Sequence, residues 1–534
     1  MTLFRNWGRG LGALVAAFFF LAPPASAAAI DAIRAMAQRQ ALEWQGIVVD
    51  LSEVMPYYAA GGAPLWVENG RPNGRADDLL AAIYKSDRDG LSPSDYSRAA
   101  LERFRRAVND SDAAGFELAM SAAFMALARD LHSGRTSPAV TEPDIVIARK
   151  PADPKAWLAM AAKNGVAKAL ARLQPQHVQY VQLRQMLAGY RALAARGGWP
   201  AVANGPALKP GMRDPRVAQM RANLTARGYS GIGSAQPDLF DGNLKEAVAH
   251  FQTRHGSEAD GIVGPATLKA LNVTAQERVR QLIVNMERWR WLPADFGARH
   301  VFVNQAAFEM FFTDKGKVID RRRVIVGKPY HKTPIFSHTM TYLDFNPTWT
   351  VTPSIAASEF LPKLRQNPGY LAANNYQLYS GWSDAAQTID PYSVNWNAVS
   401  AKSFPYRIVQ MPGEKNALGV VKFMFPNRFN IYLHDTPSRQ LFAKTGRAFS
   451  HGCIRVHKPL QFAETLLRLD QSMPRAKIDA IVDSGQLTRV RLKTGVPVHL
   501  AYFTAWVDDD GTPFFYDDVY GRDALVARLL FGQV

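Results

Sequence analysis

Cysteine is almost absent from this chain: Cys453 is the only one among 534 residues. Exported proteins that use disulfides carry cysteines in pairs, so a disulfide framework is excluded. A zinc site is also not expected, since His451 and His457 near Cys453 lack a second close thiolate or a metalloprotease-type histidine spacing. No glycine-rich phosphate loop lies between a predicted strand and a predicted helix. We therefore expect neither a metal nor a cofactor.

Long hydrophobic runs are scarce as well, and one lies at the amino terminus. Arg5 and Arg9 precede the apolar run 11–22, which Pro23-Pro24 and Ala25-Ser26-Ala27 follow. This order predicts a signal peptide cleaved after Ala27. The run is too short for a comfortable membrane span. We expect export to the periplasm or cell envelope, with no stable membrane span after cleavage.

Acidic residues are outnumbered, 46 against 63 basic ones, which gives a formal net charge of +17. Removing residues 1–27 removes two arginines and no acid, which leaves +15. The basic residues are scattered and no nucleic-acid motif is present, so no nucleic-acid partner is expected. An anionic polymer of the envelope is the better electrostatic match.

Hydrophobic periodicity divides the rest of the chain, which is too long for one core. Helical spacing prevails up to about residue 204, then again in three short helices of a unit at 205–273, and in the helix 278–291. From His300 the pattern alternates and predicts strands, at 300–304, 308–312, 322–327, 340–345, 348–351, 407–410 and 419–425. The sequence therefore predicts a multidomain α+β protein.

Two further segments accompany the predicted sheet. Residues 353–405 interrupt it, and their aromatic residues argue against disorder. Such a long insertion is usually functional. At the end of the chain, 497–507 and 512–519 read as a hairpin, and a short helix follows from Asp523.

The chemistry concentrates around Cys453. A thiolate is the nucleophile of acyl transfer, and it needs a proton shuttle and donors for the developing oxyanion. His434, at the end of the strand-like run 429–433, is the candidate shuttle. Gly452 allows the backbone to fold closely under the thiol. The alternative is a structural role, in which Cys453 is a small buried apolar residue.

The motif His434, fifteen intervening residues, Ser450-His451-Gly452-Cys453 resembles the signature of the YkuD family of L,D-transpeptidases. Arg455 stands where many members carry Asn, as in the larger YcbB-type branch. The resemblance extends to Asp89-Gly90-Leu91-Ser92-Pro93 and to Gly264-Pro265-Ala266-Thr267. It implies a helical scaffold domain at 28–204, a three-helix peptidoglycan-binding-like module at 205–273 and a mainly-β catalytic domain at 300–485 with a capping subdomain at 353–405. The sequence patterns add a signal peptide at 1–27, a linking helix at 274–299, and a C-terminal hairpin and helix at 486–534.

The resemblance also implies a function. Cys453 would attack a peptidoglycan tetrapeptide stem between its third and fourth residues, release D-alanine, and pass the acyl group to another stem as a 3→3 crosslink. His434 would shuttle the proton, and the backbone amides of His451, Gly452 and Cys453 would hold the oxyanion. Arg455 shares a strand face with Cys453 and is a candidate for binding a substrate carboxylate. An L,D-carboxypeptidase using the same site and a non-catalytic wall-binding protein are the alternatives.

Overall fold

The computed structural model describes residues 31–532 except 34, 36–39, 107 and 109–111, so the expected signal peptide lies outside it. Within the described part of the chain, no helix combines the length and apolarity needed to cross a membrane. Two compact units are present. Among the described residues, the first unit contains those up to 87, within 92–128 and within 152–171, and the second contains 88–91, 129–151 and 172–532.

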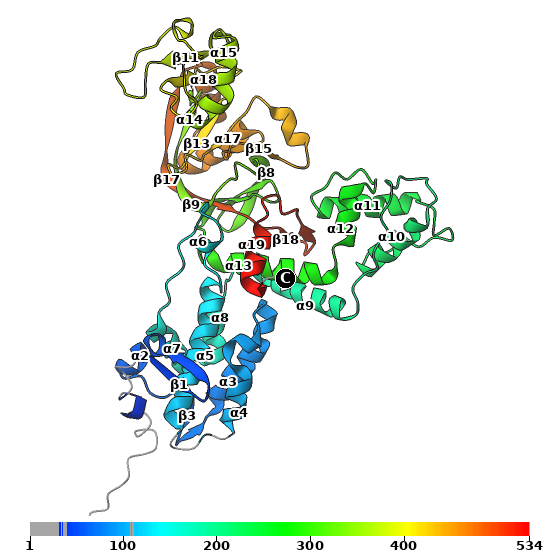
Figure 1. The fold of residues 1–534 in the computed structure, drawn as a ribbon, viewed down its shortest axis with the longest axis vertical. Coiled ribbons are helices and arrows are strands. Elements are labelled where there is room, and N and C mark those ends of the chain that lie inside the picture. Colours follow the sequence, from blue (N-terminus) through cyan, green and yellow to red (C-terminus); the bar gives the residue numbers. More distant parts are fainter. Residues whose placement is uncertain (1–30, 34, 36–39, 107, 109–111, 533–534) are drawn as a thin grey trace, which may run out of the picture. The chain divides into compact units, whose positions relative to one another are not determined.

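The first unit is a helical bundle with two small hairpins (Figure 1). Its helices are α2 (Leu51–Ala59), α3 (Gly74–Tyr84), α4 (Arg98–Arg105), α7 (Pro154–Asn164), most of α8 (Val166–Leu173) and most of α5 (Ala113–Ser133). The hairpins are β1 (Ala41–Trp44) with β2 (Ile47–Asp50), and β3 (Val67–Glu68) with β4 (Arg71–Pro72). Glu117 of α5 is fully buried and accepts hydrogen bonds from the backbone amides of Leu65, Trp66 and Val67.

In the second unit, helix α13 (Ala275–Trp291) packs on α9 (Val178–Ala195). A capping box at Thr274 and Glu277 starts α13, since each of these side chains satisfies a free backbone N–H of the first turn. Every residue of α13 from 282 to 291 is buried, so this helix is a core element and not a simple linker.

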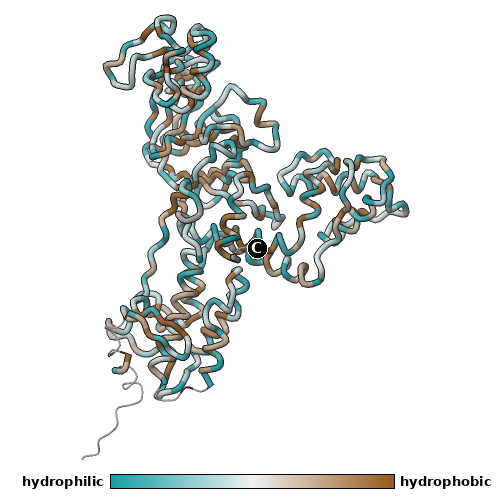
Figure 2. Tube along the Cα trace, viewed as in Figure 1, coloured by the Kyte–Doolittle hydropathy of each residue, from teal (hydrophilic) through white to brown (hydrophobic). Residues whose placement is uncertain are grey.

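Between α9 and α13 lies the predicted three-helix module, α10 (Pro215–Ala226), α11 (Gly242–Arg254) and α12 (Pro265–Asn272). Asp214 and Asp241 cap the first two helices by accepting backbone N–H bonds. The module has a hydrophobic core of its own, which includes Val217, Leu244 and Phe251. Figure 2 shows hydrophobic stretches inside this module as well as along the strands of the sheet.

The sheet of the second unit closes on itself. Its order is β13-β14-β16-β8-β7-β6-β17-β9, and β9 pairs again with β13. The strands are β6 (Arg299–Asn304), β7 (Glu309–Asp314), β8 (Lys317–Gly327), β9 (Ile335–Phe345), β13 (Val421–Met424), β14 (Leu433–His434), β16 (Ile454–Val456) and β17 (Thr488–Ala501), with β5 (Ile145–Val146) and β15 (Ala448–Ser450) attached to β9 and β8. One face of the sheet forms the core together with α17 (Pro459–Gln471). The multidomain α+β class is thereby confirmed.

Two predicted strands form, but they pair with other strands than expected. Residues 348–351 and 407–410 were expected to continue the main sheet. Instead β10 (Trp349–Thr350) and β12 (Arg407–Gln410) form a separate three-stranded sheet with β11 (Tyr376–Tyr379). This sheet and the helices α15 (Leu361–Gln366) and α16 (Tyr370–Ala373) surround their own core, which includes Phe360, Leu371 and Trp396.

The C-terminal hairpin also differs from the prediction. Residues 497–501 belong to β17, which lies between β6 and β9 in the main sheet. The hairpin is shorter and consists of β18 (Ala505–Val507) and β19 (Pro513–Phe515). Alternation indicates that a segment is a strand, but it does not indicate which strand becomes its neighbour. The chain ends in α19 (Arg522–Phe531), near the predicted start at Asp523.

Candidate active site

The two strands that carry the motif lie side by side. β14 and β16 are parallel, with Leu433 opposite Ile454 and His434 opposite Arg455. Leu433 and Ile454 are buried in the core, so the residues on either side of them point to the second face of the sheet. Cys453, His434 and Arg455 therefore share one face.

The turn before Cys453 is held by its own hydrogen bonds. Gly452 has a φ of +112°, a region that side chains disfavour. A Cβ atom there would also lie 3.2 Å from Cδ1 of Ile431. Ser450 Oγ donates to the Cys453 carbonyl at 2.5 Å and accepts the Gly452 N–H at 3.1 Å. The Gly452 amide is thus bonded within the turn.

The thiol of Cys453 is half-buried. Its Sγ lies 3.6 Å from the Asn430 carbonyl oxygen. Burial raises the pKa of the thiol, whereas Tyr432, Lys422 and Arg455 act in the opposite direction. Because burial prevails, the resting group is a protonated thiol that needs a base when it reacts.

His434 is 4% exposed, and burial, followed by the charges of Arg455 and Lys422, lowers its pKa to about 3. The imidazole is therefore neutral at pH 7 and able to accept a proton. The backbone of Asp435 acts in the opposite direction, although Nδ1 of His434 has no hydrogen-bond partner among the described residues. The Asp435 side chain points away and accepts the Val420 N–H at 3.0 Å.

Two residues of this face were missed by the sequence reasoning. Tyr432, two residues before His434 on the same strand run, has its pKa raised by burial and then by the neighbouring Cys453. Lys422 lies opposite His434 in β13, and its ammonium group lies 4.0 Å from the centre of the Tyr432 ring. The alternation of the strand could have indicated Tyr432. Nothing in the sequence indicates Lys422, because its place depends on how β13 pairs.

Arg455 is half-buried, and its Nε has no hydrogen-bond partner within the described part of the chain. Burial lowers its pKa, while the nearby Cys453 raises it. A guanidinium group with an unused donor that faces the thiol can bind an anion.

The side chain of His451 points elsewhere. Its Nε2 lies 2.7 Å from Oε1 of Glu359, and its ring lies 4.9 Å from that of His331. Glu359 belongs to the π-helical turn 356–360 of the inserted subdomain. Over the residues that the structure covers, no group of three or more histidine, cysteine or carboxylate side chains is arranged to hold a metal ion.

Three protein-family profiles match the chain. Their descriptions are "Scaffold domain" for residues 52–187, "Putative peptidoglycan binding domain" for 213–271 and "L,D-transpeptidase catalytic domain" for 298–499, the last being the YkuD family. The catalytic match begins just before β6, ends within β17 and includes every residue of the face described above.

Two curated proteins are similar to parts of the chain. A Haemophilus influenzae protein named "Putative L,D-transpeptidase" is 34% identical over 257 residues, which are 48% of this chain and 50% of that protein. The N-acetylmuramoyl-L-alanine amidase CwlM of Mycobacterium tuberculosis is 41% identical over 81 residues, 14% of this chain and 20% of that protein. The chain thus spans half or less of the length of these relatives.

Solved L,D-transpeptidases are also similar. One from Xylanimonas cellulosilytica shares 14% identity and a TM-score of 0.19, over 56% of this chain and 99% of that one. One from Mycobacterium smegmatis shares 12% identity and a TM-score of 0.18, over 38% and 58%. TM-scores this low carry no argument. On the three family matches, the chain carries a catalytic domain of the YkuD family of L,D-transpeptidases, together with a scaffold domain and a peptidoglycan-binding domain.

Proposed function

We propose that this protein is a peptidoglycan L,D-transpeptidase that forms 3→3 crosslinks through a thioester on Cys453. One observation carries the proposal: the only cysteine of the chain shares a sheet face with a buried neutral histidine and two cationic groups, inside the region that matches the transpeptidase profile. A lone thiol in such a setting is suited to acyl transfer from an anionic substrate.

In the first half of the reaction, Cys453 Sγ attacks the carbonyl carbon between the third and fourth stem residues. The thiol proton passes to His434, and then to the leaving nitrogen as the C–N bond breaks and D-alanine departs. In the second half, the side-chain amine of another stem attacks the thioester and loses a proton to His434. The C–S bond breaks, the thiol is restored and the crosslink is formed.

The tetrahedral intermediates need donors for their oxyanion. We propose that the amides at His451, Gly452 and Cys453 form this site, with the Cys453 N–H as its main donor. The Gly452 N–H already bonds to Ser450 Oγ, whereas the Cys453 N–H has no acceptor among the described residues. The carbonyl of Asp435 is the natural partner for His434 Nδ1 once the imidazole is protonated.

Stem peptides end in carboxylates, and we propose that Arg455 and Lys422 bind them. The charges of both cations act to lower the pKa of the Cys453 thiol, and Arg455 Nε has no hydrogen-bond partner among the described residues. The three-helix module would hold the enzyme on peptidoglycan, after export to the periplasm or cell envelope. The domains follow the predicted division, except that the inserted subdomain extends over 349–410 and β17 belongs to the catalytic domain.

The test uses residues 28–534 and purified disaccharide-tetrapeptide, with mass analysis of dimers and free D-alanine. Wild type should give both products, and Cys453→Ala should give neither because only the nucleophile is lost. Crosslinked dimer from Cys453→Ala would refute the assignment.

The same experiment separates the two alternatives. Release of D-alanine with tripeptide and no dimer would identify an L,D-carboxypeptidase, in which water is the acceptor. A non-catalytic wall-binding protein would release no D-alanine and would show no rapid mass shift with iodoacetamide or a carbapenem.

A further inference from the structure

We infer that Thr333 is a positioning residue of the oxyanion site, held in place by the C-terminal residues Tyr520 and Arg522. This inference rests on the proposed function, since it assigns a task to the Cys453 amide. Thr333 is fully buried in the loop between β8 and β9, about 120 positions before the cysteine. Neither composition nor motif singles it out.

The hydroxyl of Thr333 bridges two backbone groups. Oγ1 donates to the Gly452 carbonyl at 2.7 Å and accepts the Gly327 N–H at 2.9 Å. The loop also packs tightly there, because a Cβ atom on Gly327 would lie 1.9 Å from the His331 carbonyl oxygen and 3.1 Å from the Gly452 Cα.

The Gly452 carbonyl and the Cys453 N–H belong to one peptide unit. That unit is planar and trans, so its C=O and N–H point in opposite directions. A hydrogen bond that fixes the carbonyl therefore fixes the direction of the N–H. At the left-handed Gly452, where the backbone has most freedom, this contact decides where the proposed donor points.

The C-terminal segment holds Thr333 from behind. The Tyr520 hydroxyl donates to the Gly327 carbonyl at 2.7 Å and accepts the Thr333 N–H at 3.3 Å, so it closes the loop at both ends. Both terminal nitrogens of Arg522 lie 3.3 Å from the Thr333 carbonyl oxygen.

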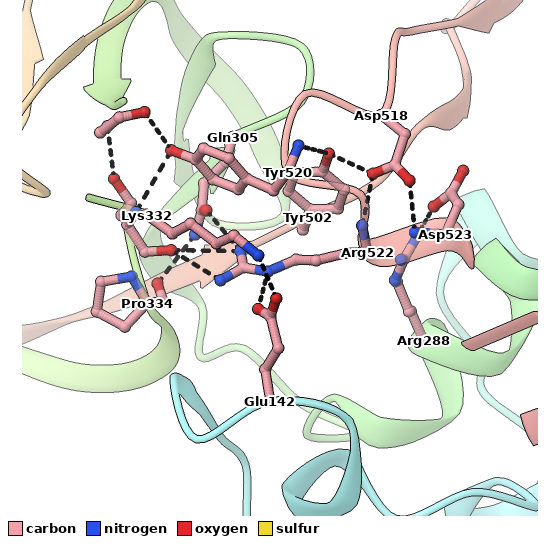
Figure 3. A network of polar contacts seen from close by, with 12 residues as sticks. Glu142, Arg288, Gln305, Lys332, Pro334, Tyr502, Asp518, Tyr520, Arg522 and Asp523 are labelled. Atoms are coloured by element: carbon pink, nitrogen blue, oxygen red, sulfur yellow. Dashed lines mark hydrogen bonds and ion pairs between the residues drawn. The ribbon is translucent and has the colours of Figure 1, made fainter. Parts of the chain in front are cut away.

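Arg522 is itself fixed from several sides (Figure 3). It is 1% exposed, and its Nε donates to Glu142 at 2.7 Å while Nη1 donates to Gln305 at 3.2 Å. Gln305 in turn donates to the Pro334 carbonyl at 3.0 Å, and Glu142 also pairs with Lys332. The segments that carry Glu142, Gln305 and Arg522 therefore meet at the loop that supports Gly452.

Two reactions of Cys453 distinguish a positioning role of Thr333 from a general loss of structure at the active site. Alkylation by iodoacetamide forms no oxyanion, whereas acylation by meropenem or by the tetrapeptide does. Thr333→Val keeps the shape of the side chain and removes the hydrogen bond. We expect acylation to fall about 10- to 100-fold, less than the 10²- to 10³-fold loss of a whole oxyanion donor. The rate of alkylation should stay within about twofold of wild type, because alkylation needs no oxyanion donor.

Thr333→Ser keeps the hydroxyl and should restore acylation to within about threefold of wild type. Thr267→Val is the matched control, because Thr267 is also buried and its hydroxyl bonds to Gln252 and the Ile262 carbonyl within the three-helix module. It should leave the ratio of acylation to alkylation unchanged.

Equal loss of both reactions in Thr333→Val, or acylation at the wild-type rate, would overturn the inference. If that variant does not fold, Tyr520→Phe takes its place, with an expected drop of at least about threefold in the ratio and an unchanged ratio as the contrary result. A wild-type protein that is alkylated but never acylated would contradict the proposed function as well, so the two failures can be told apart.

Discussion

At the scale of single residues, the neutral state of His434 is the property that most affects the chemistry. Burial and two neighbouring cations hold its pKa at about 3, and burial raises that of the Cys453 thiol. The resting pair is therefore thiol and imidazole, and not thiolate and imidazolium. An approaching substrate carboxylate would offset the cations and make His434 a stronger base.

His434→Ala should slow acylation of Cys453 at pH 7 by about 10²- to 10⁴-fold, because the proton shuttle is lost. Partial rescue is expected at alkaline pH, where the thiol ionises without a base, because burial raises the pKa of Cys453. Stopped-flow acylation with a carbapenem measures both effects. His457→Ala is the control, because that ring packs on Phe442 and lies beyond the end of β16. A variant acylated at the wild-type rate would place the shuttle elsewhere.

The same histidine makes stability depend on pH. Its folded pKa lies below the unfolded value of 6.5, so the unfolded chain binds the extra proton first. Its contribution is complete above pH 6.5 and is lost as the pH falls towards 3. Between pH 6.5 and 4.5 this loss should amount to about 2 kcal/mol. Urea unfolding of wild type and His434→Asn at both values tests this, and equal pH slopes for the two proteins would contradict it.

At the scale of elements, helix α5 holds the Leu65–Val67 segment through one buried carboxylate. Glu117 accepts three backbone N–H groups and the Tyr58 hydroxyl, the last at 2.6 Å. Burial outweighs these donors and raises the pKa of Glu117 to about 7. The donors would lose their acceptor together if the side chain were removed.

Glu117→Ala should therefore destabilise the first unit by at least about 3 kcal/mol, since each buried donor left without a partner costs roughly 1–3 kcal/mol. Thermal unfolding and limited proteolysis within 41–171 provide the measurement. Glu102→Ala serves as the control, because the half-exposed Arg98–Glu102 pair is worth less than about 0.5 kcal/mol. Equal melting temperatures for the two variants would refute the role of the carboxylate.

At the scale of the whole molecule, the inserted subdomain has its own core and sheet and touches the nucleophile turn through Glu359 and His451. Its two ends lie close together, because Asn416 donates to the Pro347 carbonyl at 2.9 Å. A segment built in this way can be removed without cutting the main sheet. If the proposed acyl-enzyme forms, we expect this subdomain to exclude water from it.

Replacing residues 349–410 with a short Gly/Ser linker should raise the ratio of tripeptide to crosslinked dimer, because water would compete with the amine acceptor. Cys453 should remain open to iodoacetamide, which checks that its strand is intact. Glu359→Ala removes only the contact with His451 and should shift the product ratio in the same direction, by a smaller amount. An unchanged ratio in a folded deletion variant would leave the subdomain a role in packing or partner binding.

Much of this protein follows from its sequence alone. The periods of 3.6 and 2 predicted the helices of the module and most strands of the sheet, since local propensity and burial of one face agree there. The motif predicted a reactive Cys453 with His434, because an unpaired thiol after a glycine turn and a histidine at a strand end are local patterns. The same alternation placed Arg455 on the face of the thiol.

Tertiary structure decided what depends on neighbours that are distant in the chain. The pairing of β13 with β14 places Lys422 opposite His434. Loop contacts bring Thr333 to Gly452 and Arg522 to Thr333, each across more than a hundred residues of the chain. The low pKa of His434 arises from burial and from cations on two other strands. Periodicity fixes which face of a strand a residue occupies. Only the closure of the sheet fixes which strands meet, and therefore which charges surround the thiol.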